Sequence, residues 1–556
     1  MRLGYVSDER DVALAGVEVE VERDGETVLV TRTTARGRIL GDLPPGEYLV
    51  TLRHPDHGGK RTRLTVGGGA APARLRLLSR RLLGYLWPRA VRAGERGETH
   101  FSSHEPYHLS LWRYGAEKEH IRDLGWYDEH GPESMAQILP DGDVASSGAA
   151  WNRVGYGGNP HHTMTLTAPE RSGLYYVHAR DESGAFFTAP WVVAPAAGAA
   201  GTARIAVILS TNTWNAYNNF GGRSNYVNAR RLPDEPTVNA RQDLDRFDAT
   251  AASGWAYPDD EYEPLSFERP EPANHIPADV RATDPIAGRL ASSLAPAEWR
   301  MLAWLEREGL DHDVFSDHQL HGGVLDLDRY RAAIASVHPE YWSRAMFEAV
   351  SGWVGDRGGR FAYLGGNGLN CEVRFVDRPG RSGAGAALQF RTFLLDTGGP
   401  LGMPDADDPS TWYDSRFHRS VAPEAALIGV ATTETGIMTA APYRVAAGAG
   451  SHWVFAGTGL TDGSVFGERS LHERCPGGAS GHETDKRTAW TPVGAVLLAK
   501  GLNPDDGGAE IVFHDTTSGG AVFSVGSIIW PSSLLVDGAV SRITLNVLRR
   551  FTDSDT

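Results

Sequence analysis

The alternation of apolar and polar residues predicts short β-strands in the first third of the chain. Strand patterns rich in β-branched and aromatic residues lie at 17–21, 27–30, 46–52, 107–112 and 173–179, and glycine-containing turns such as Asp24-Gly25 separate them. This pattern is typical of half-buried antiparallel strands. A Gly-Ala-rich joint at 67–73 and a second one at 194–201 divide the segments. We therefore expect two β-sandwich modules, over residues 1–80 and 81–195.

The pattern changes after residue 202. Continuous apolar runs of strand length lie at 205–209, 332–337, 360–364 and 453–456, as expected of strands that are buried on both faces. Helical periodicity lies between them, at 296–309 and at 343–354. Strands that alternate with helices predict a mostly parallel α/β domain over residues 202–556, and the whole chain is then a multidomain β plus α/β protein.

Charge and cysteine content narrow the classes of function. The 556 residues include 54 Lys and Arg against 70 Asp and Glu, for a formal charge of −16, and no basic run occurs. This charge argues against nucleic acid as a partner. No apolar stretch reaches the ~18 residues of a membrane span, and the first residues lack the apolar core of a signal peptide. Two cysteines are too few for a disulfide scaffold, so we expect a cytoplasmic protein.

Polar residues follow the predicted strands, where parallel sheets hold their ligands. His338 and Glu340 follow the run at 332–337, Asn367 follows the run at 360–364, and a loop dense in amides and aromatic rings follows the run at 205–209. For the single asparagines of that loop, a role as a helix cap or turn residue is as good an interpretation. For Glu340 a functional role is the better interpretation, because it lies beside a histidine and a tyrosine at a strand end.

A glycine-rich loop at 474–486 carries further candidates for proton transfer. His482, Glu483 and Asp485 are of the right residue types, and the glycines allow the backbone to approach another element closely. Taken alone, the loop is equally typical of a solvated acidic turn.

Two other kinds of site compete for the same chemistry. Cys371 follows a strand and, with His338 and Glu340, could form the thiol site of an amidohydrolase, as in glutamine amidotransferases. Asn370 and Glu372 flank it instead of the glycines of a tight elbow, which favours an inert buried thiol. His312, Asp317, His318 and His321 have suitable types for a metal cluster. These residues precede the predicted strand at 332–337 and do not follow it, so we rank the cluster below Glu340.

Five motifs together resemble the large subunit of N,N-dimethylformamidase. They lie at 213–224 (TWNAYNNFGGRS), 266–270 (SFERP), 338–342 (HPEYW), 364–368 (LGGNG) and 478–483 (GASGHE). The resemblance implies an amide hydrolase with a mononuclear, non-haem Fe3+ ion that two tyrosines and one glutamate hold. By motif, the glutamate is Glu340 and one tyrosine is Tyr217. The other is Tyr257, with Tyr262 as the substitute.

The resemblance also implies roles for three more residues and a substrate class. His338 and Asn367 would lie beside the metal or contact the substrate, and Glu483 would act as the base. The substrate would be a small carboxamide such as an N-substituted formamide, and a homo-oligomer or a small accessory subunit would complete the assembly. The chemistry agrees, because phenolate and carboxylate are hard oxygen donors that suit a ferric ion, which polarises a carbonyl as a Lewis acid.

Three hypotheses follow for the function. The first is an iron-dependent hydrolase of a small carboxamide, and the second is a Cys371-dependent amidohydrolase with a fold similar to that of glutamine amidotransferases. The third is a non-catalytic protein whose β modules bind a glycan or another protein. Iron content separates the first from the others, and a Cys371→Ser variant separates the second.

Overall fold

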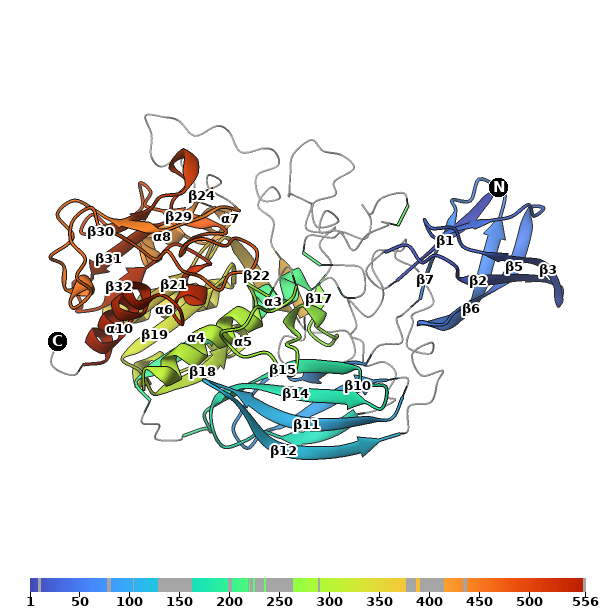
Figure 1. The fold of residues 1–556 in the computed structure, drawn as a ribbon, viewed down its shortest axis with the longest axis horizontal. Helices are drawn as coiled ribbons and strands as arrows, with labels where there is room; N and C mark the ends of the chain where they lie inside the picture. Colours follow the sequence, from blue (N-terminus) through green and yellow to red (C-terminus); the bar gives the residue numbers. More distant parts are fainter. Residues whose placement is uncertain are drawn as a thin grey trace.

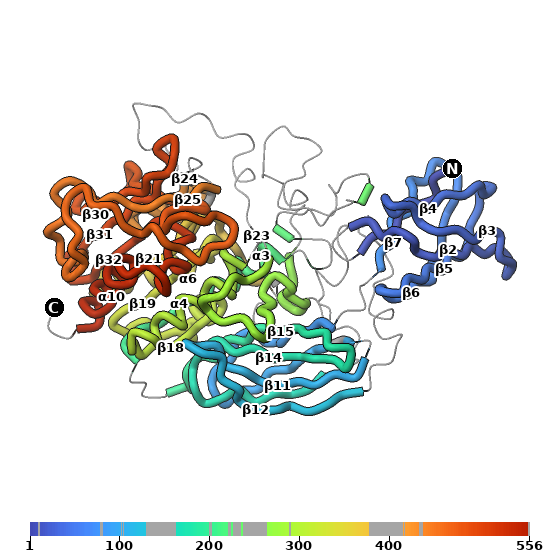
Figure 2. The backbone as a smooth tube through the Cα atoms, in the orientation of Figure 1, coloured from blue at the N-terminus to red at the C-terminus, as the bar shows by residue number. Residues whose placement is uncertain are grey.

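The computed structural model describes residues 1–8, 12–77, 82–103, 105–128, 163–198, 203–218, 220, 224–225, 235–236, 264–288, 291–376, 387–390, 415–433 and 438–553. Over these ranges the chain is rich in β-structure, and its sheets fall into three successive parts (Figure 1). The two termini lie at opposite ends of the molecule (Figure 2).

The first part is a small β-sandwich of two sheets. One sheet has the strand order β4-β1-β7 and the other has the order β3-β2-β5-β6. The strands are β1 (Arg2–Ser7), β2 (Glu18–Arg23), β3 (Glu26–Arg32), β4 (Arg38–Leu40), β5 (Gly46–His54), β6 (His57–Val66) and β7 (Ala73–Arg76). The predicted alternation in β2 is confirmed, because Val19 and Val21 point into the core. This core contains residues of the first part alone, from Leu3 to Leu77.

The second part is a larger sandwich with sheets of three and five strands. Their orders are β13-β10-β8 and β12-β11-β14-β15-β9. The strands are β8 (Leu83–Trp87), β9 (Ala90–Arg92), β10 (Arg96–Ser102), β11 (Tyr107–Tyr114), β12 (Lys118–Tyr127), β13 (Thr163–Thr167), β14 (Gly173–Asp181) and β15 (Phe186–Ala194). The predicted strands at 107–112 and 173–179 are confirmed as β11 and β14, and they pair with each other.

The second sandwich shares a hydrophobic core with the third part of the chain. Tyr114 and Tyr176 stack with ring centroids 4.2 Å apart, and the ring of Trp299 lies 4.9 Å from that of Tyr114. The Trp299 indole also donates to the carbonyl of Gly115 at 2.8 Å. Leu174 and Val192 belong to the same core. Burial of these side chains from both parts makes the two parts one hydrophobic unit.

The third part is built around a nine-stranded mixed sheet. Its order is β18-β16-β19-β21-β32-β31-β30-β26-β27. The strands are β16 (Ile205–Leu209), β18 (His312–Ser316), β19 (Ala332–Val337), β21 (Arg360–Gly365), β26 (Tyr443–Val445), β27 (Val465–Phe466), β30 (Val496–Gly501), β31 (Glu510–Asp515) and β32 (Ala521–Ser524). Pairing is parallel from β18 to β32 and antiparallel from β32 to β27. The expectation of a mostly parallel sheet therefore holds for one half only.

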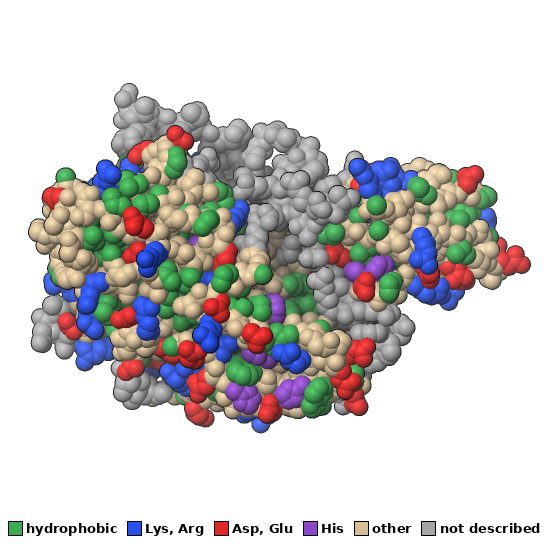
Figure 3. Space-filling model, viewed as in Figure 1, with side chains coloured by type: hydrophobic (Ala, Val, Ile, Leu, Met, Phe, Trp, Pro, Cys, Tyr) green, Lys and Arg blue, Asp and Glu red, His purple; other side chains and the backbone are tan. Residues whose placement is uncertain are grey.

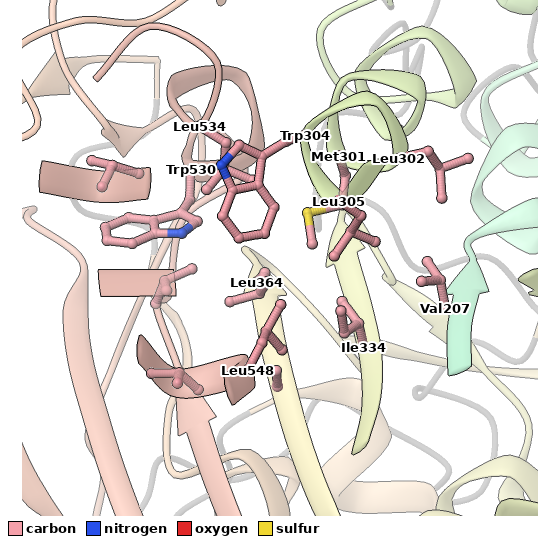
Figure 4. Close-up of a cluster of buried hydrophobic side chains, with 14 of the residues drawn as sticks. Val207, Met301, Leu302, Trp304, Leu305, Ile334, Leu364, Trp530, Leu534 and Leu548 are labelled. Atoms are coloured by element: carbon pink, nitrogen blue, oxygen red, sulfur yellow. The ribbon is translucent and has the colours of Figure 1, made fainter. Parts of the chain in front are cut away.

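Helices cover both faces of this sheet, which explains the continuous apolar runs. The helices are α3 (Thr211–Tyr217), α4 (Ala295–Arg307), α5 (Asp317–His321), α6 (Arg344–Arg357), α7 (Arg416–Ser420), α8 (Glu424–Ile428), α9 (Trp530–Ser533) and α10 (Gly538–Thr552). Trp304 of α4, Trp530 of α9 and Leu548 of α10 pack on one face, over Ile334 and Leu364 (Figure 4). Residues of α6 and α8 pack on the other face. None of the helices in the described ranges is long and apolar enough to cross a membrane.

Small sheets and one wrongly predicted element complete the third part. The further strands are β17 (Leu265–Ser266), β20 (Tyr341–Trp342), β22 (Cys371–Val376), β23 (Ala387–Phe390), β24 (Ala431–Thr433), β25 (Ala440–Ala441), β28 (Ser480–Gly481) and β29 (Thr484–Lys486). The strand predicted at 453–456 is wrong, because Trp453–Phe455 form a 3-10 helix, η9. His452 caps it by accepting from the Val454 amide, and Trp453 lies under Arg550 of α10. These four apolar residues cover a helix and do not extend the sheet.

The order of the parallel strands reverses between β16 and β19. The chain leaves β16 toward β18 on one side and leaves β19 toward β21 on the other, although β16 and β19 are neighbours in the sheet. Such a reversal separates the loops that follow the two strands, and ligands of open α/β sheets bind at this point. The residues after β16 and β19 are therefore the first place to look for a site.

Candidate functional site

Tyr217 and Glu340 meet at the point where the strand order reverses. Tyr217 is the last residue of α3, which follows β16, and Glu340 lies in the loop that follows β19. The Tyr217 hydroxyl donates to Oε2 of Glu340 at 3.0 Å. The Glu340 side chain is 6% exposed, and Tyr217 is half-buried. A phenol and a carboxylate thus present two oxygen atoms to the same point.

His338 lies between two carboxylates. Its Nε2 is 3.1 Å from Oε2 of Glu340 and 3.3 Å from Oε2 of Glu483. Neither contact has the alignment of a good hydrogen bond, so both are ion pairs. Burial by itself lowers the pKa of His338, but the charges of Glu340 and Glu483 outweigh burial and raise this pKa to about 10.

Glu483 and Asn367 form the other side of the site. The Asn367 side-chain amide donates to Oε2 of Glu483 at 2.6 Å, and 18% of the Glu483 side chain is exposed. Burial raises the pKa of Glu483, whereas the charge of His338, the contacts with His338 and Asn367 and the charge of Arg474 lower it, and the balance is a lowered pKa. An ionised carboxylate that solvent can reach is able to take a proton from a water molecule.

Left-handed backbone turns aim these side chains. Val337, Asn367 and Glu483 have φ angles of 63°, 49° and 83°, in the region that residues other than glycine seldom adopt. Val337 is β-branched, so its conformation is the most unusual of the three. Strained backbone of this kind is common at functional sites, where the surrounding structure holds it in place.

Buried polar contacts fix α3 to the loop that carries Glu340. The Thr213 hydroxyl donates to the carbonyl of His338 at 2.7 Å and accepts from the Glu340 amide at 3.3 Å. The side chain of Asn212 donates to the carbonyl of Tyr341. Asn212 is thus structural although it lies inside α3, whereas Asn218 is the C-cap of α3, as one of the two interpretations of this loop predicted.

Arg269 and Glu298 support α3 from its two ends, and reasoning from the sequence missed both. Arg269 is fully buried, and its Nη2 donates to the carbonyl and to the side-chain oxygen of Asn215. Glu298 of α4 accepts from the Ser210 amide and from the Trp214 indole, each at 2.7 Å. Burial raises the pKa of Glu298 to about 7, although these hydrogen bonds lower it. A charged residue on the apolar face of a predicted helix was the signal that could have revealed Glu298.

The structure brings five of the predicted site residues into one chain of contacts and leaves others outside it. The five are Tyr217, Glu340, His338, Glu483 and Asn367. Tyr257 and Tyr262, the candidates for the second tyrosine, lie outside the described residues. The roles given to all seven residues stay predictions.

Two predicted members of the loop at 474–486 have other contacts. His482 is buried, and its ring nitrogens face His472 at 2.8 Å and Arg474 at 3.2 Å. Asp485 is fully buried behind Asn367.

The competing metal cluster is wrong. Asp317 is buried and accepts from the Asn212 amide. The rings of His318 and His321 pack against Phe375, and the Nδ1 of His312 faces the carbonyl of Leu310. Over the described ranges, no group of three or more His, Cys, Asp or Glu side chains is arranged to hold a metal ion.

The thiol alternative has a different geometry from the one that a nucleophile needs. Cys371 is 1% exposed, and its sulfur faces the carbonyl of Glu372 at 3.7 Å, whereas the His338 ring faces Glu340 and Glu483. A reactive thiol requires a base at its sulfur and access for a substrate. This burial favours the interpretation of Cys371 as an inert thiol.

The chain is similar in sequence to one family of known proteins. A family model described as "N,N-dimethylformamidase beta subunit-like, C-terminal" matches residues 118–541. The N,N-dimethylformamidase beta subunit of Paracoccus aminophilus is 27% identical over 305 residues, which make up 46% of this chain and 36% of the relative. The protein of the same name from Alcaligenes sp is 26% identical over 306 residues, again 46% of this chain and 36% of the relative. The match thus spans about a third of each relative's length.

The likeness of this chain to a solved structure of Ig domains is weak. The N-terminal four Ig domains of Dscam1 isoform 8.4 align with 32% of this chain and cover 37% of their own, at 10% identity and a TM-score of 0.12. A score this low supports no argument about fold or function.

Proposed function

The chain belongs to the N,N-dimethylformamidase beta subunit-like family, and from this membership we propose that it hydrolyses the C–N bond of a small carboxamide, such as an N-substituted formamide. The observation that carries the proposal is the meeting of Tyr217 with Glu340 at 3.0 Å, beside His338, Glu483 and Asn367. The names of the relatives, which match only in part, support the same reaction class.

The donor set at Tyr217 and Glu340 fits a ferric ion. Phenolate and carboxylate are hard anionic oxygen donors, the kind that suits a ferric ion, and Tyr217 and Glu340 would supply one of each. The two oxygen atoms here are 3.0 Å apart. Tyr257, or Tyr262 in its place, would be the third ligand. When bound, Fe3+ would supply Lewis-acid polarisation of the amide carbonyl.

Glu483 would transfer protons, and Asn367 would hold Glu483 and stabilise the transition state. Glu483 is the base of the proposal, because its carboxylate is partly exposed and its pKa is lowered. It would take a proton from the attacking water and return one to the departing amine. Asn367 holds Oε2 of Glu483 through one amide hydrogen. The second hydrogen of the same amide would donate to the developing oxyanion, a kind of contact worth ~3 kcal/mol in other hydrolases.

His338 would orient both carboxylates. Its ring lies within ion-pair distance of Glu340 and Glu483, and its ring centroid is 5.5 Å from that of Tyr217. A single side chain that contacts a metal-holding carboxylate and the base fixes their separation.

We also propose that residues 1–80, 81–195 and 202–556 are the three domains, and that the last one resembles glutamine amidotransferase folds. The parallel pairing of β16, β18, β19, β21 and β32, with helices on both faces, supports this architecture.

Iron analysis combined with an amine-release assay tests the proposal. Purified protein should contain a single iron per chain, absorb visible light through phenolate bound to Fe3+, and release amine from N-substituted formamides. A Cys371→Ser variant should keep this activity. A colourless, iron-free preparation that hydrolyses the same amides would contradict the iron proposal, and activity that Cys371→Ser abolishes would move the reaction to the thiol.

A further inference from the structure

Two loops meet behind the site and hold each other in place. One loop follows β21 and carries Asn367, and the other joins β28 to β29 and carries Glu483. Two residues of the first loop are glycines for a steric reason, Gly366 because it faces the second loop and Gly368 because it faces Tyr363 of β21. A Cβ on Gly366 would lie 2.7 Å from the carbonyl oxygen of Glu483, and a Cβ on Gly368 would lie 2.5 Å from the ring of Tyr363. At Gly366 the two loops therefore approach each other too closely for a side chain.

Asp485 is the group that joins the two loops. Its side chain is fully buried, Oδ1 accepts from the Asn367 amide at 2.8 Å, and Oδ2 accepts from the Tyr363 hydroxyl at 2.7 Å. The Tyr363 hydroxyl in turn accepts from the Gly368 amide at 2.7 Å. One carboxylate thus holds two consecutive backbone amides, one directly and one through a phenol. Carboxylate hydrogen bonds of this kind are among the stronger ones in proteins.

The contacts form a closed ring with the base of the proposed reaction. Asn367 donates its backbone amide to Asp485 and its side-chain amide to Glu483, which lies two residues before Asp485. The backbone of Asp485 is itself fixed, because its amide donates to Gly526 and its residue pairs with Thr432 of β24. Asn367, which is in the left-handed region, is thus held at its backbone and at its side chain, and Glu483 is held at its side chain.

We propose that Asp485, with Tyr363, is a positioning residue that sets where Glu483 and Asn367 stand relative to each other. Asp485 does not touch the substrate. It acts through Asn367, whose backbone it holds and whose side chain aims the Glu483 carboxylate. Displacement of a catalytic group by about 1 Å can reduce a rate by about 100-fold. The inference rests on the proposed function for its kinetic consequence, but the loop contact itself can be measured without a substrate.

Burial shifts the pKa of both side chains at this contact. Burial raises the pKa of Asp485 to about 7, in spite of the hydrogen bonds from Tyr363 and Asn367 that lower it. Burial also raises the pKa of Tyr363 well above its ordinary value. Tyr363 therefore stays a phenol and keeps the proton that it donates to Asp485.

An Asp485→Asn variant tests the inference, with Asp462→Asn as the matched control. Asp462 also accepts from two backbone amides of one loop, Gly448 and Gly450, each at 2.7 Å. That loop joins β26 to β27, at the edge of the sheet farthest from β16. In the complete chain, Asp485→Asn should lower kcat about 10- to 100-fold, with KM changed less than about threefold. Deuterium exchange of the peptides at 365–369 and 481–485 should speed up by a similar factor. The iron content and the visible absorption should match the unmutated protein. Asp462→Asn should change none of these.

The other outcomes overturn the inference or separate it from the proposed function. Unchanged exchange at both loops overturns it, and so does faster exchange with an unchanged kcat. If Asp485→Asn fails to fold, Tyr363→Phe replaces it, since this variant removes only the hydroxyl between Asp485 and Gly368. If the unmutated protein releases no amine from any amide, the proposed function fails, and deuterium exchange alone then decides whether Asp485 holds the two loops.

Discussion

The Tyr217 hydroxyl lies 3.0 Å from Oε2 of Glu340, although 123 residues separate them in the chain. The two residues follow β16 and β19, which are adjacent in the sheet and whose connections leave in opposite directions. Both contribute oxygen atoms, and His338 lies next to both. This single relationship leads to predictions about metal content, proton transfer and stability.

Replacement of Tyr217 by Phe should remove the bound iron. The phenol oxygen is lost while the ring is kept, so the fold should persist and the visible absorption should disappear. Loss of a group that only orients a ligand weakens metal binding by about 10- to 100-fold, so loss of a direct ligand should exceed about 100-fold. Iron titration measures this change. Tyr330→Phe is the control, since its hydroxyl contacts Asp313, and retention of iron and colour in Tyr217→Phe would reject the assignment.

Replacement of Glu483 by Gln should abolish proton transfer and leave the iron in place. A glutamine oxygen still accepts from Asn367, so the local contacts should survive. General acid–base catalysis contributes about 100- to 10,000-fold, and kcat should fall within that range. Steady-state amine release measures it. The same change at Glu510, which accepts from Arg487, should leave kcat unaltered. A Glu483→Gln enzyme with full activity would assign the base to another group.

Replacement of Thr213 by Val should destabilise the protein and loosen the site. The shape is kept, but the carbonyl of His338 and the amide of Glu340 lose their hydroxyl partner. A buried polar group without a partner costs about 1–3 kcal/mol. Urea unfolding should show this loss together with weaker iron binding. Thr544→Val, which disturbs a contact with Trp530, should lower stability without any effect on iron. Equal iron binding in both variants would contradict the prediction.

Glu298 should make stability depend on pH. Burial raises its pKa from 4.5 to about 7, against the lowering effect of its hydrogen bonds from Ser210 and Trp214. Between these values the native carboxyl holds a proton that the unfolded chain has released, so stability falls as pH rises from about 4.5 to 7. Each pKa unit corresponds to about 1.4 kcal/mol, so the effect is on the order of 3 kcal/mol. We therefore compare the free energy of unfolding of the unmutated protein with that of Glu298→Gln. The first minus the second should decrease as the pH rises from 5 to 8. A difference that stays constant would show that the pKa is ordinary.

The first sandwich should be removable and the second should not. The core of the first contains residues from Leu3 to Leu77 alone, whereas Tyr114 and Tyr176 pack with Trp299 of α4. A chain that begins at residue 78 should keep the melting temperature and the activity of the third part. A chain that begins at residue 203 should aggregate, because it exposes the apolar surface around Trp299. Calorimetry and light scattering distinguish these results, and a soluble, cooperative chain from 203 onward would contradict the shared core.

Much of the fold could be predicted from local pattern, because strands and helices carry their own periodicity. The buried strands β16, β19 and β21 and the helices α4 and α6 were predicted from apolar runs and from a 3.6-residue repeat. The antiparallel half of the large sheet was not, since pairing direction depends on contacts between distant segments. The run at 453–456 failed for a related reason. Four apolar residues suit a strand and a helix-covering turn equally well.

The candidate site could be predicted only in part. Polar residues at strand ends pointed to His338, Glu340 and Asn367, because parallel strands direct their carboxyl ends to the same edge. The meeting of Glu483 with Asn367 depends on close packing between two distant loops, which no local pattern reveals. Arg269 lies in the motif at 266–270, but the sequence does not reveal that it donates hydrogen bonds to the end of α3.

The left-handed residues around the site carry a consequence for any attempt to improve this protein. Val337, Asn367, Leu369, His482 and Glu483 all have positive φ angles, and each such conformation costs about 1–3 kcal/mol. The chain therefore gives up a sizeable share of the stability that its large core could provide in order to keep these groups aimed. Selection for heat resistance alone would favour glycine or rebuilt turns at these positions, and the most heat-resistant descendants would be the ones whose polar groups no longer converge.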